Sequence, residues 1–209
     1  MERCELEKLL IEYGKRIEAK NLTPGTSGNM SVRCGDNFLI TASGSSNGHL
    51  KSDDIVSIDK SGNNTDVNSK KPSSEKLLHI CIYNKRPDIN AILHVHSTYL
   101  SSFAAAGIPL DVPVMAENTF YFGQIPLAEY ALPSSVELAE KTSAFFDNYD
   151  AVLMANHGFV VGAKTIQDAY LKLELAESYA QIVLNTYILG GAKPLSKQQE
   201  LEILALRNK

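Results

Sequence analysis

Tryptophan is absent from this chain of 209 residues, and cysteine occurs only three times, as Cys4, Cys34 and Cys81. Three widely separated cysteines do not make a disulfide framework, so we expect reduced thiols. No apolar run is long enough to span a bilayer, which excludes a helical membrane protein. The first five residues open a charged amphipathic segment rather than a signal peptide, so a cytoplasmic protein is expected.

Basic clusters are also missing. The formal net charge is −4, and lysine and arginine form no run longer than a pair, so the sequence predicts no nucleic-acid partner. Any anionic ligand must then be bound by local groups rather than by a broad positive field. With 44% hydrophobic and 21% charged residues, the composition is that of an ordinary soluble protein, and we expect one domain over residues 1–209.

Short apolar strands alternate with polar turns and with amphipathic helices. This pattern predicts an α/β protein whose sheet is mostly antiparallel rather than built from regular βαβ units. Strands are expected at 38–41, 55–58, 92–97, 151–155 and 159–163, and helices at 4–20, 71–83, 99–106, 136–146, 165–189 and 197–206. The continuous apolar run 151–155 predicts a central strand, with 159–163 as its hairpin partner. Residues 109–130 are expected to be irregular.

Two histidines share the short apolar strand 92–97. Side chains at i and i+2 of a strand point to the same face, so His94 and His96 project together. A third histidine, His157, lies at the end of a different apolar strand, next to Gly158. Neutral imidazole is a common zinc ligand, and three imidazoles with one carboxylate complete a four-coordinate site. The alternative is that these are polar residues at strand ends and turns.

Glu75 is the carboxylate best placed to join the histidines, because it lies in the first turn of the helix that precedes the His94 strand. Its alternative role is a first-turn acid that complements the helix dipole. Three loops carry glycine and hydroxyl residues that are able to cradle an anion with backbone N–H groups, although each is also compatible with an ordinary turn or helix cap. These loops contain Gly28 and Asn29, Ser43 and Gly44, and Ser73 and Ser74.

Four segments occur together in the order and spacing of the class II aldolase/adducin family, which the chain resembles from about residue 5 to residue 189. They are Gly25–Ser31, Pro72–Glu75, His94–Ser97 and Ala155–Gly158. The resemblance implies a three-layer α-β-α fold with helices on both faces of the sheet. It also implies a homotetramer with active sites at subunit interfaces. The apolar seam of residues 169–187 is typical of core or of a subunit interface, and the second role would suit such a tetramer.

The resemblance implies a role for each candidate residue. His94, His96 and His157 would bind one zinc ion per chain, with Glu75 as fourth ligand at rest and as general acid/base during the reaction. The phosphate of a sugar substrate would rest on six residues: Gly28, Asn29, Ser43, Gly44, Ser73 and Ser74. A tyrosine helps to protonate the aldehyde in these enzymes, and Tyr121 is the candidate here.

Among members of this family, the chain is most similar to the bacterial L-fuculose-1-phosphate aldolases. The expected reaction is reversible cleavage of L-fuculose 1-phosphate, or a related ketose 1-phosphate, to dihydroxyacetone phosphate and an aldehyde such as L-lactaldehyde. Other members with the same zinc site are sugar-acid-phosphate decarboxylases, methylthioribulose-phosphate dehydratases and pentulose-5-phosphate 4-epimerases, so these reactions remain alternatives. A non-catalytic assembly module, as in adducin, is a further alternative.

Overall fold

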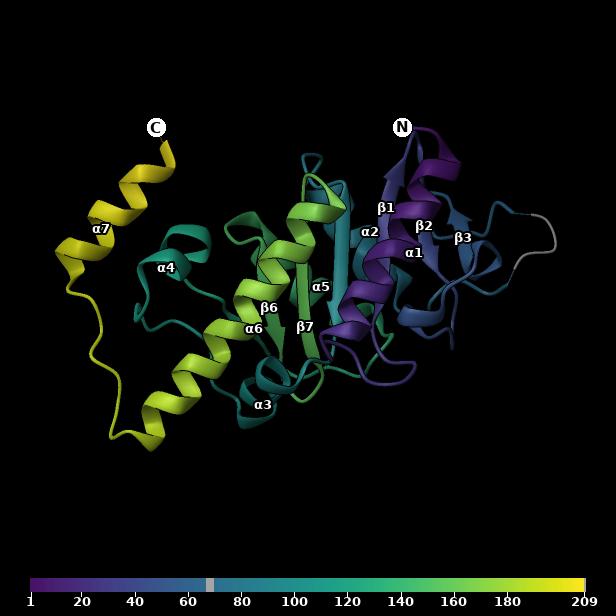
Figure 1. Ribbon diagram of the computed structural model, residues 1–209. Helices are drawn as coiled ribbons and strands as arrows, with labels where there is room; N and C mark the ends of the chain where they lie inside the picture. Colours follow the sequence, from purple (N-terminus) through teal and green to yellow (C-terminus); the bar gives the residue numbers. More distant parts are fainter. Residues whose placement is uncertain (67–69, 209) are drawn as a thin grey trace.

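A seven-stranded sheet crosses the molecule in the order β3-β2-β1-β4-β7-β6-β5, as seen in a computed structural model that describes residues 1–66 and 70–208 (Figure 1). The strands are β1 (Asn29–Cys34), β2 (Asn37–Thr41), β3 (Ile55–Ile58), β4 (Ala91–Val95), β5 (Leu127–Ala128), β6 (Ala151–Met154) and β7 (Gly158–Ala163). The helices are α1 (Arg3–Ala19), α2 (Lys76–Lys85), α3 (Thr98–Ala106), α4 (Ala116–Phe122), α5 (Val136–Ala144), α6 (Ile166–Ile188) and α7 (Lys197–Ala205).

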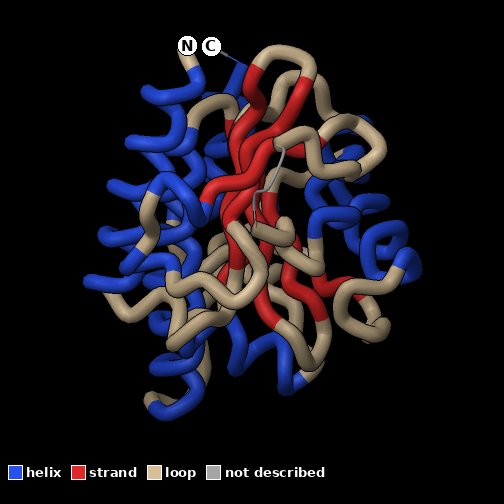
Figure 2. Tube along the Cα trace, turned by 90° about the vertical axis from the view of Figure 1, so that its right-hand side faces the viewer, coloured by secondary structure: helices blue, strands red, loops and turns tan. Residues whose placement is uncertain are grey.

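Alternating side chains along the strands feed two apolar cores, one on each face of the sheet. On β4, Ala91, Leu93 and Val95 pack into the core that also holds α1, α3 and α6. Ile92 points the other way, into the core formed with α2 and α5. Helices therefore cover both faces (Figure 2), which agrees with the expected α-β-α layering.

The sheet is mixed, with parallel as well as antiparallel pairs, so it departs from the expected antiparallel pattern at one edge. Strand β5 pairs in parallel with β6, with Leu127 opposite Leu153, whereas the other pairs of strands in the described residues run antiparallel. Strand β5 has only two residues, too few to show a strand period in the sequence.

Strand β6 is also less central than its apolar run predicted. It lies between β7 and the edge strand β5, and β4 occupies the middle of the sheet. Its burial comes from the helices on both faces rather than from a central position. Residues 109–130, expected to be irregular, contain helix α4 as well as β5.

The stripe along α6 is a core seam within the chain. Ala169, Leu173, Ala176 and Ala180 are each 0% exposed and contribute to the core beneath α6. Of the two roles that the spacing predicts, core and subunit interface, this packing supports the core for these four residues. Only its last member, Tyr187, is exposed, at the end of the helix where Ile188 is exposed too.

Helix α7 lies at the edge of the molecule, next to α4 (Figure 1). It has no buried residue among its described side chains, and its capping box joins Ser196 and Gln199. Arg207, just beyond it, donates hydrogen bonds to the carbonyl oxygens of Thr119 and Phe120 in α4. Among the described residues, none of the helices combines the length and apolar character that a bilayer crossing requires.

Helix α3 begins directly after the His96 turn, and its N-terminus is capped by a residue from another helix. The N-cap residue, Ser97, uses its hydroxyl to donate to the carboxylate of Glu177 on α6 at 2.7 Å. The same carboxylate accepts the backbone N–H groups of Tyr99 at 2.9 Å and Leu100 at 3.0 Å. Glu177 therefore satisfies free N–H groups of α3 and holds the turn that carries His96 against α6.

Replacing Glu177 by alanine removes the acceptor of all three hydrogen bonds. We expect Glu177→Ala to lower the free energy of unfolding by about 2–3 kcal/mol, since charged hydrogen bonds at a helix N-terminus are lost together. Urea unfolding followed by circular dichroism measures this change. The control is Gln181→Ala, which removes one exposed hydrogen bond between the same helices, from Gln181 to Tyr99, and should cost under about 1 kcal/mol. Equal losses in the two variants would contradict the capping role.

Candidate active site

The candidate residues lie together at one end of the central strands. Strand β1 begins where its antiparallel neighbour β4 ends, and β6 ends where β7 begins. Asn29 at the start of β1 therefore lies directly opposite His94. His157 sits in the turn between β6 and β7, where Asn156 adopts a left-handed backbone with φ 55°. The start of α2 reaches the same end from the adjacent core.

The three histidines converge, as their positions on separate strands predicted. The ring centroids of His94, His96 and His157 lie 4.8, 4.9 and 5.1 Å from one another. The Nε2 atoms of His94 and His96 are 3.0 Å apart. The ligand atoms of the three residues all lie within 4.8 Å of one another, so the group is able to hold a metal ion.

Glu75 completes the group. Its Oε2 lies 2.9 Å from Nε2 of His94, and its Oε1 lies 3.2 Å from Nε2 of His157. Glu75 is the N-cap residue of α2, yet its side chain does not cap the helix, because it turns into the site instead. The Ser73 hydroxyl accepts the backbone N–H of Glu75 at 3.2 Å, so this serine supports the turn that leads into α2.

The donor set fits a divalent cation such as zinc. Nδ1 of His94 donates to the carbonyl oxygen of Phe159 at 2.9 Å, which leaves the lone pair of His94 on Nε2, facing His96 and Glu75. Two lone pairs 3.0 Å apart repel unless a proton or a cation lies between them. Tetrahedral zinc with nitrogen ligands separates those nitrogens by about 3.3 Å, close to the spacing seen here. Oε1 of Glu75 is buried and accepts no hydrogen bond from the described residues, as expected of a metal-ligand atom.

The protonation states agree with metal binding. Burial, reinforced by the neighbouring imidazoles, lowers the pKa of His96 to about 4, and burial also lowers the pKa of His157. Burial alone would raise the pKa of Glu75, but its contacts with His94 and His157 and the hydrogen bond from Asn29 outweigh burial and hold that pKa below its usual range. At neutral pH His96 and His157 are therefore neutral and Glu75 is ionised, the forms in which these groups bind a metal.

A cleft of about 220 Å³ opens beside the histidines. All six residues expected to bind phosphate line it, together with Glu75, His96 and His157: Gly28, Asn29, Ser43, Gly44, Ser73 and Ser74. The structure thus brings the three Gly- and Ser-containing loops to one place next to the candidate metal ligands. Lysine and arginine do not line this cleft in the described chain, so an anion there would rest on hydroxyl, amide and backbone N–H groups.

The cleft also contains residues that the sequence reasoning did not single out as site residues. Thr26 lies in the first loop, and Pro133 and Ser134 come from the segment before α5. Ser134 has a left-handed backbone with φ 66°, and the next residue, Ser135, caps α5 by accepting the N–H of Leu138. A repeated tripeptide in the sequence is a signal that points to Pro133 and Ser134. Pro-Ser-Ser precedes both α2 and α5, at residues 72–74 and 133–135.

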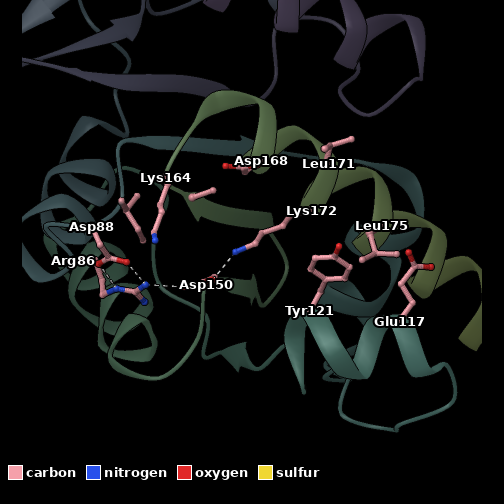
Figure 3. A pocket seen from close by; sticks show the side chains of 12 residues that line it. Arg86, Asp88, Glu117, Tyr121, Asp150, Lys164, Asp168, Leu171, Lys172 and Leu175 are labelled. Carbon is pink, nitrogen blue, oxygen red and sulfur yellow. Dashed lines mark hydrogen bonds and ion pairs between the residues drawn. The ribbon is translucent and has the colours of Figure 1, made fainter. Parts of the chain in front are cut away.

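Tyr121 does not reach this site within one chain. It lies on α4, near Lys172 and Leu175 (Figure 3). There it lines a separate cavity of about 500 Å³ at the opposite end of strands β4, β6 and β7. Helix α4 packs against α6 and α7, and this packing keeps Tyr121 away from His157. In this larger cavity, Arg86 and Lys172 both pair with Asp150 (Figure 3).

Comparison with known proteins identifies the family. Residues 8–184 match the family described as "Class II Aldolase and Adducin N-terminal domain". The chain belongs to the class II aldolase and adducin family. It is an enzyme of the class II aldolase type, a lyase, and the metal dependence of class II aldolases agrees with the histidine site.

Two relatives and one solved structure illustrate the similarity. An L-fuculose phosphate aldolase of Methanocaldococcus jannaschii is 38% identical over 181 residues, 85% of this chain and 95% of that protein. A 5-deoxy-D-ribulose 1-phosphate aldolase of Bacillus thuringiensis serovar kurstaki is 34% identical over 199 residues, 94% of this chain and 92% of that protein. A solved L-fuculose 1-phosphate aldolase superposes with a TM-score of 0.92 at 32% identity, covering 100% of this chain and 99% of that one.

Gly28 is the tightest packing point in the first loop. It has φ +71°, and a Cβ atom there would lie 2.5 Å from the carbonyl oxygen of His94, a backbone atom that has little freedom to move. Gly25 has a similar φ of +60° but has nothing within 4 Å of the same position. Alanine substitutions at the two positions therefore distinguish the energetic cost of backbone strain from that of steric contact.

We expect Gly25→Ala to cost about 1 kcal/mol of unfolding free energy from the left-handed backbone alone. Gly28→Ala adds a clash with the β4 backbone and should cost about 2–3 kcal/mol more. Chemical denaturation of both variants measures the difference. If the two alanines cost the same, the close approach of Gly28 to His94 does not constrain the fold.

Proposed function

We propose that residues 1–209 form one class II aldolase domain that uses zinc to cleave a ketose 1-phosphate reversibly into dihydroxyacetone phosphate and an aldehyde. The observation that carries this proposal is the convergence of three imidazoles and Glu75 beside a cleft lined by hydroxyl and amide groups. The imidazoles and Glu75 form a site for a Lewis-acidic metal, and the cleft forms a site for an anionic phosphate.

Cleavage of the sugar breaks the bond between C3 and C4. The C4 hydroxyl gives up its proton as the aldehyde forms, and the electron pair of the broken bond remains on the dihydroxyacetone phosphate part. Zinc bound by His94, His96 and His157 would supply Lewis acidity at the carbonyl and hydroxyl oxygens of that part. Glu75, which lines the cleft, takes up a proton from solvent and delivers it to C3 in cleavage; in condensation it removes that proton from C3 and returns it to solvent.

The phosphate rests on neutral groups in this proposal. Ser73 and Ser74 lie just before α2, and the loop with Ser43 and Gly44 lies alongside them, since Ala42 pairs with Pro72. Gly28 and Asn29 supply N–H donors from the start of β1. Free N–H groups at the start of a helix and in glycine loops favour a phosphate without a nearby lysine or arginine, which explains how an acidic chain accommodates an anionic sugar.

Two substrates have specific support. One relative is named for L-fuculose phosphate and another, similar over more of this chain, for 5-deoxy-D-ribulose 1-phosphate. Both sugars would leave dihydroxyacetone phosphate, and they differ only in the aldehyde: L-lactaldehyde from the first and acetaldehyde from the second. We therefore propose a ketose 1-phosphate as the substrate class, with these two sugars as candidates.

We further propose a cytoplasmic homotetramer with its sites near subunit interfaces. The support is a set of exposed apolar side chains at the end of α6 and in the C-terminal segment that follows it: Tyr187, Ile188, Leu189, Leu201 and Leu206. Because Tyr121 is remote from the site of its own chain, a proton donor for the aldehyde end has to come from another residue or from a neighbouring copy.

The proposal predicts that purified protein contains one zinc ion per chain and releases dihydroxyacetone phosphate from at least one of the two sugars. Elemental analysis measures the metal, and a coupled NADH assay measures the triose phosphate. Treatment with a chelator should abolish release, because the Lewis acid is lost, and added zinc should restore it. No triose phosphate from either sugar with metal-loaded protein would refute the assignment, and NMR of the mixture would then reveal dehydration, decarboxylation or epimerisation products.

Glu75→Gln should retain the metal, since three imidazoles remain, and should lower kcat by about 10²–10⁴-fold, because the amide is unable to transfer the proton. The control is Glu18→Gln, which alters another carboxylate paired with a histidine, His49, at 3.3 Å on the surface. That control should leave kcat unchanged. Full turnover by Glu75→Gln would remove Glu75 from the proposed role.

A further inference from the structure

His79 is a buried histidine that the proposed chemistry does not use. It lies one helical turn after Glu75 on α2 and is 1% exposed. Burial lowers the pKa of His79 to about 3, so its ring is neutral at physiological pH. A neutral imidazole has one N–H and one lone pair, and its hydrogen bonds depend on which nitrogen carries the proton.

Both ring nitrogens of His79 have partners. Nε2 lies 2.5 Å from Oδ1 of Asn29, and Nδ1 lies 2.6 Å from the Ser31 hydroxyl. That hydroxyl lies 2.8 Å from the Tyr83 hydroxyl. Asn29 and Ser31 are on the same face of β1, because they are two residues apart in a strand. The four side chains form one buried chain of hydrogen bonds behind Glu75.

The direction of this chain follows from its end at Glu75. An ionised carboxylate only accepts hydrogen bonds, so the Nδ2 group of Asn29 donates to Oε2 of Glu75, at 3.2 Å. The amide oxygen of Asn29 then faces His79, which has to donate from Nε2. Nδ1 of His79 accepts from Ser31, and Ser31 accepts from Tyr83. Every hydrogen bond therefore points toward Glu75.

The far end of the chain is fixed in the core. Tyr83 is 2% exposed, its ring stacks on Phe38 at 4.4 Å, and the Arg33 guanidinium carbon lies 4.9 Å from the ring centre. Burial raises the pKa of Tyr83, so its hydroxyl stays protonated and remains a donor. A donor that neither moves nor titrates sets the orientation of the groups that follow it.

We propose that His79 is a positioning residue that donates from Nε2 to Asn29 and thereby keeps the NH₂ group of Asn29 turned toward the Glu75 carboxylate. This inference rests on the proposed function of Glu75. With the amide turned over, its oxygen would face the carboxylate at 3.2 Å and repel it. Glu75 would leave its position beside His94 and His157, and its proton transfer to substrate would slow.

Two amide variants separate positioning from packing. In His79→Gln, the side-chain nitrogen reaches the former position of Nε2 and still donates to Asn29, while the contact with Ser31 is lost. In His79→Asn, the shorter side chain reaches only the former position of Nδ1, so Ser31 keeps a partner and Asn29 loses its donor. Both variants replace the buried ring with an amide, so a purely structural role would affect them alike.

We expect His79→Gln to retain kcat within about threefold of the wild type, and His79→Asn to lower kcat by about tenfold or more with a smaller change in KM. Comparable kcat losses in the two variants, or a change confined to KM in His79→Asn, would overturn the proposal. Thermal unfolding of each variant identifies any that does not fold.

A second measurement needs neither activity nor a variant. Nitrogen-15 NMR of histidine-labelled, metal-free protein should show His79 with its proton on Nε2. A proton on Nδ1 would overturn the proposal, because Asn29 would then present its oxygen to Glu75. If the wild type cleaves neither sugar phosphate, the proposed function fails, while the NMR result still decides the tautomer of His79.

Discussion

Antiparallel pairing of β4 with β1 and β7 sets the position of the groups at the site. In this register Asn29, His94 and Val160 lie side by side across three strands. Side chains alternate along a strand, so a slip of one residue would turn His94 into the opposite core and expose Leu93 at the site. The backbone ladder, more than any loop, therefore decides which side chains meet Glu75.

Charge at this site is balanced locally. Glu75 is buried, yet it stays ionised because imidazoles and the Asn29 amide surround it. Behind it the hydrogen bonds run in one direction to a fixed tyrosine, and in front of it the cleft presents hydroxyl and N–H groups. This arrangement requires no basic side chain, which agrees with a net charge of −4 and with the absence of a basic face from the sequence.

Residue spacing within single segments predicted the features that depend on neighbours in the sequence. The spacing of His94 and His96 predicted a shared face, and the apolar run before His157 predicted its place at a strand end. Features that depend on tertiary packing were missed or misread. Tyr121 lies on a helix that the Pro- and Gly-containing sequence concealed, and its distance from the site follows from how α4 packs on α6. His79 makes its contacts because β1 and α2 pack together, and no residue spacing within either segment predicts these contacts.

The central place of β4 and the peripheral place of α7 have a dynamic consequence. Backbone amides of β4 are bonded on both sides and covered by two cores, so they exchange with solvent water only when the whole sheet opens. Helix α7 buries none of its described side chains and detaches at little cost. Partial unfolding therefore begins at the C-terminal edge and leaves the imidazole cluster assembled until the final cooperative transition.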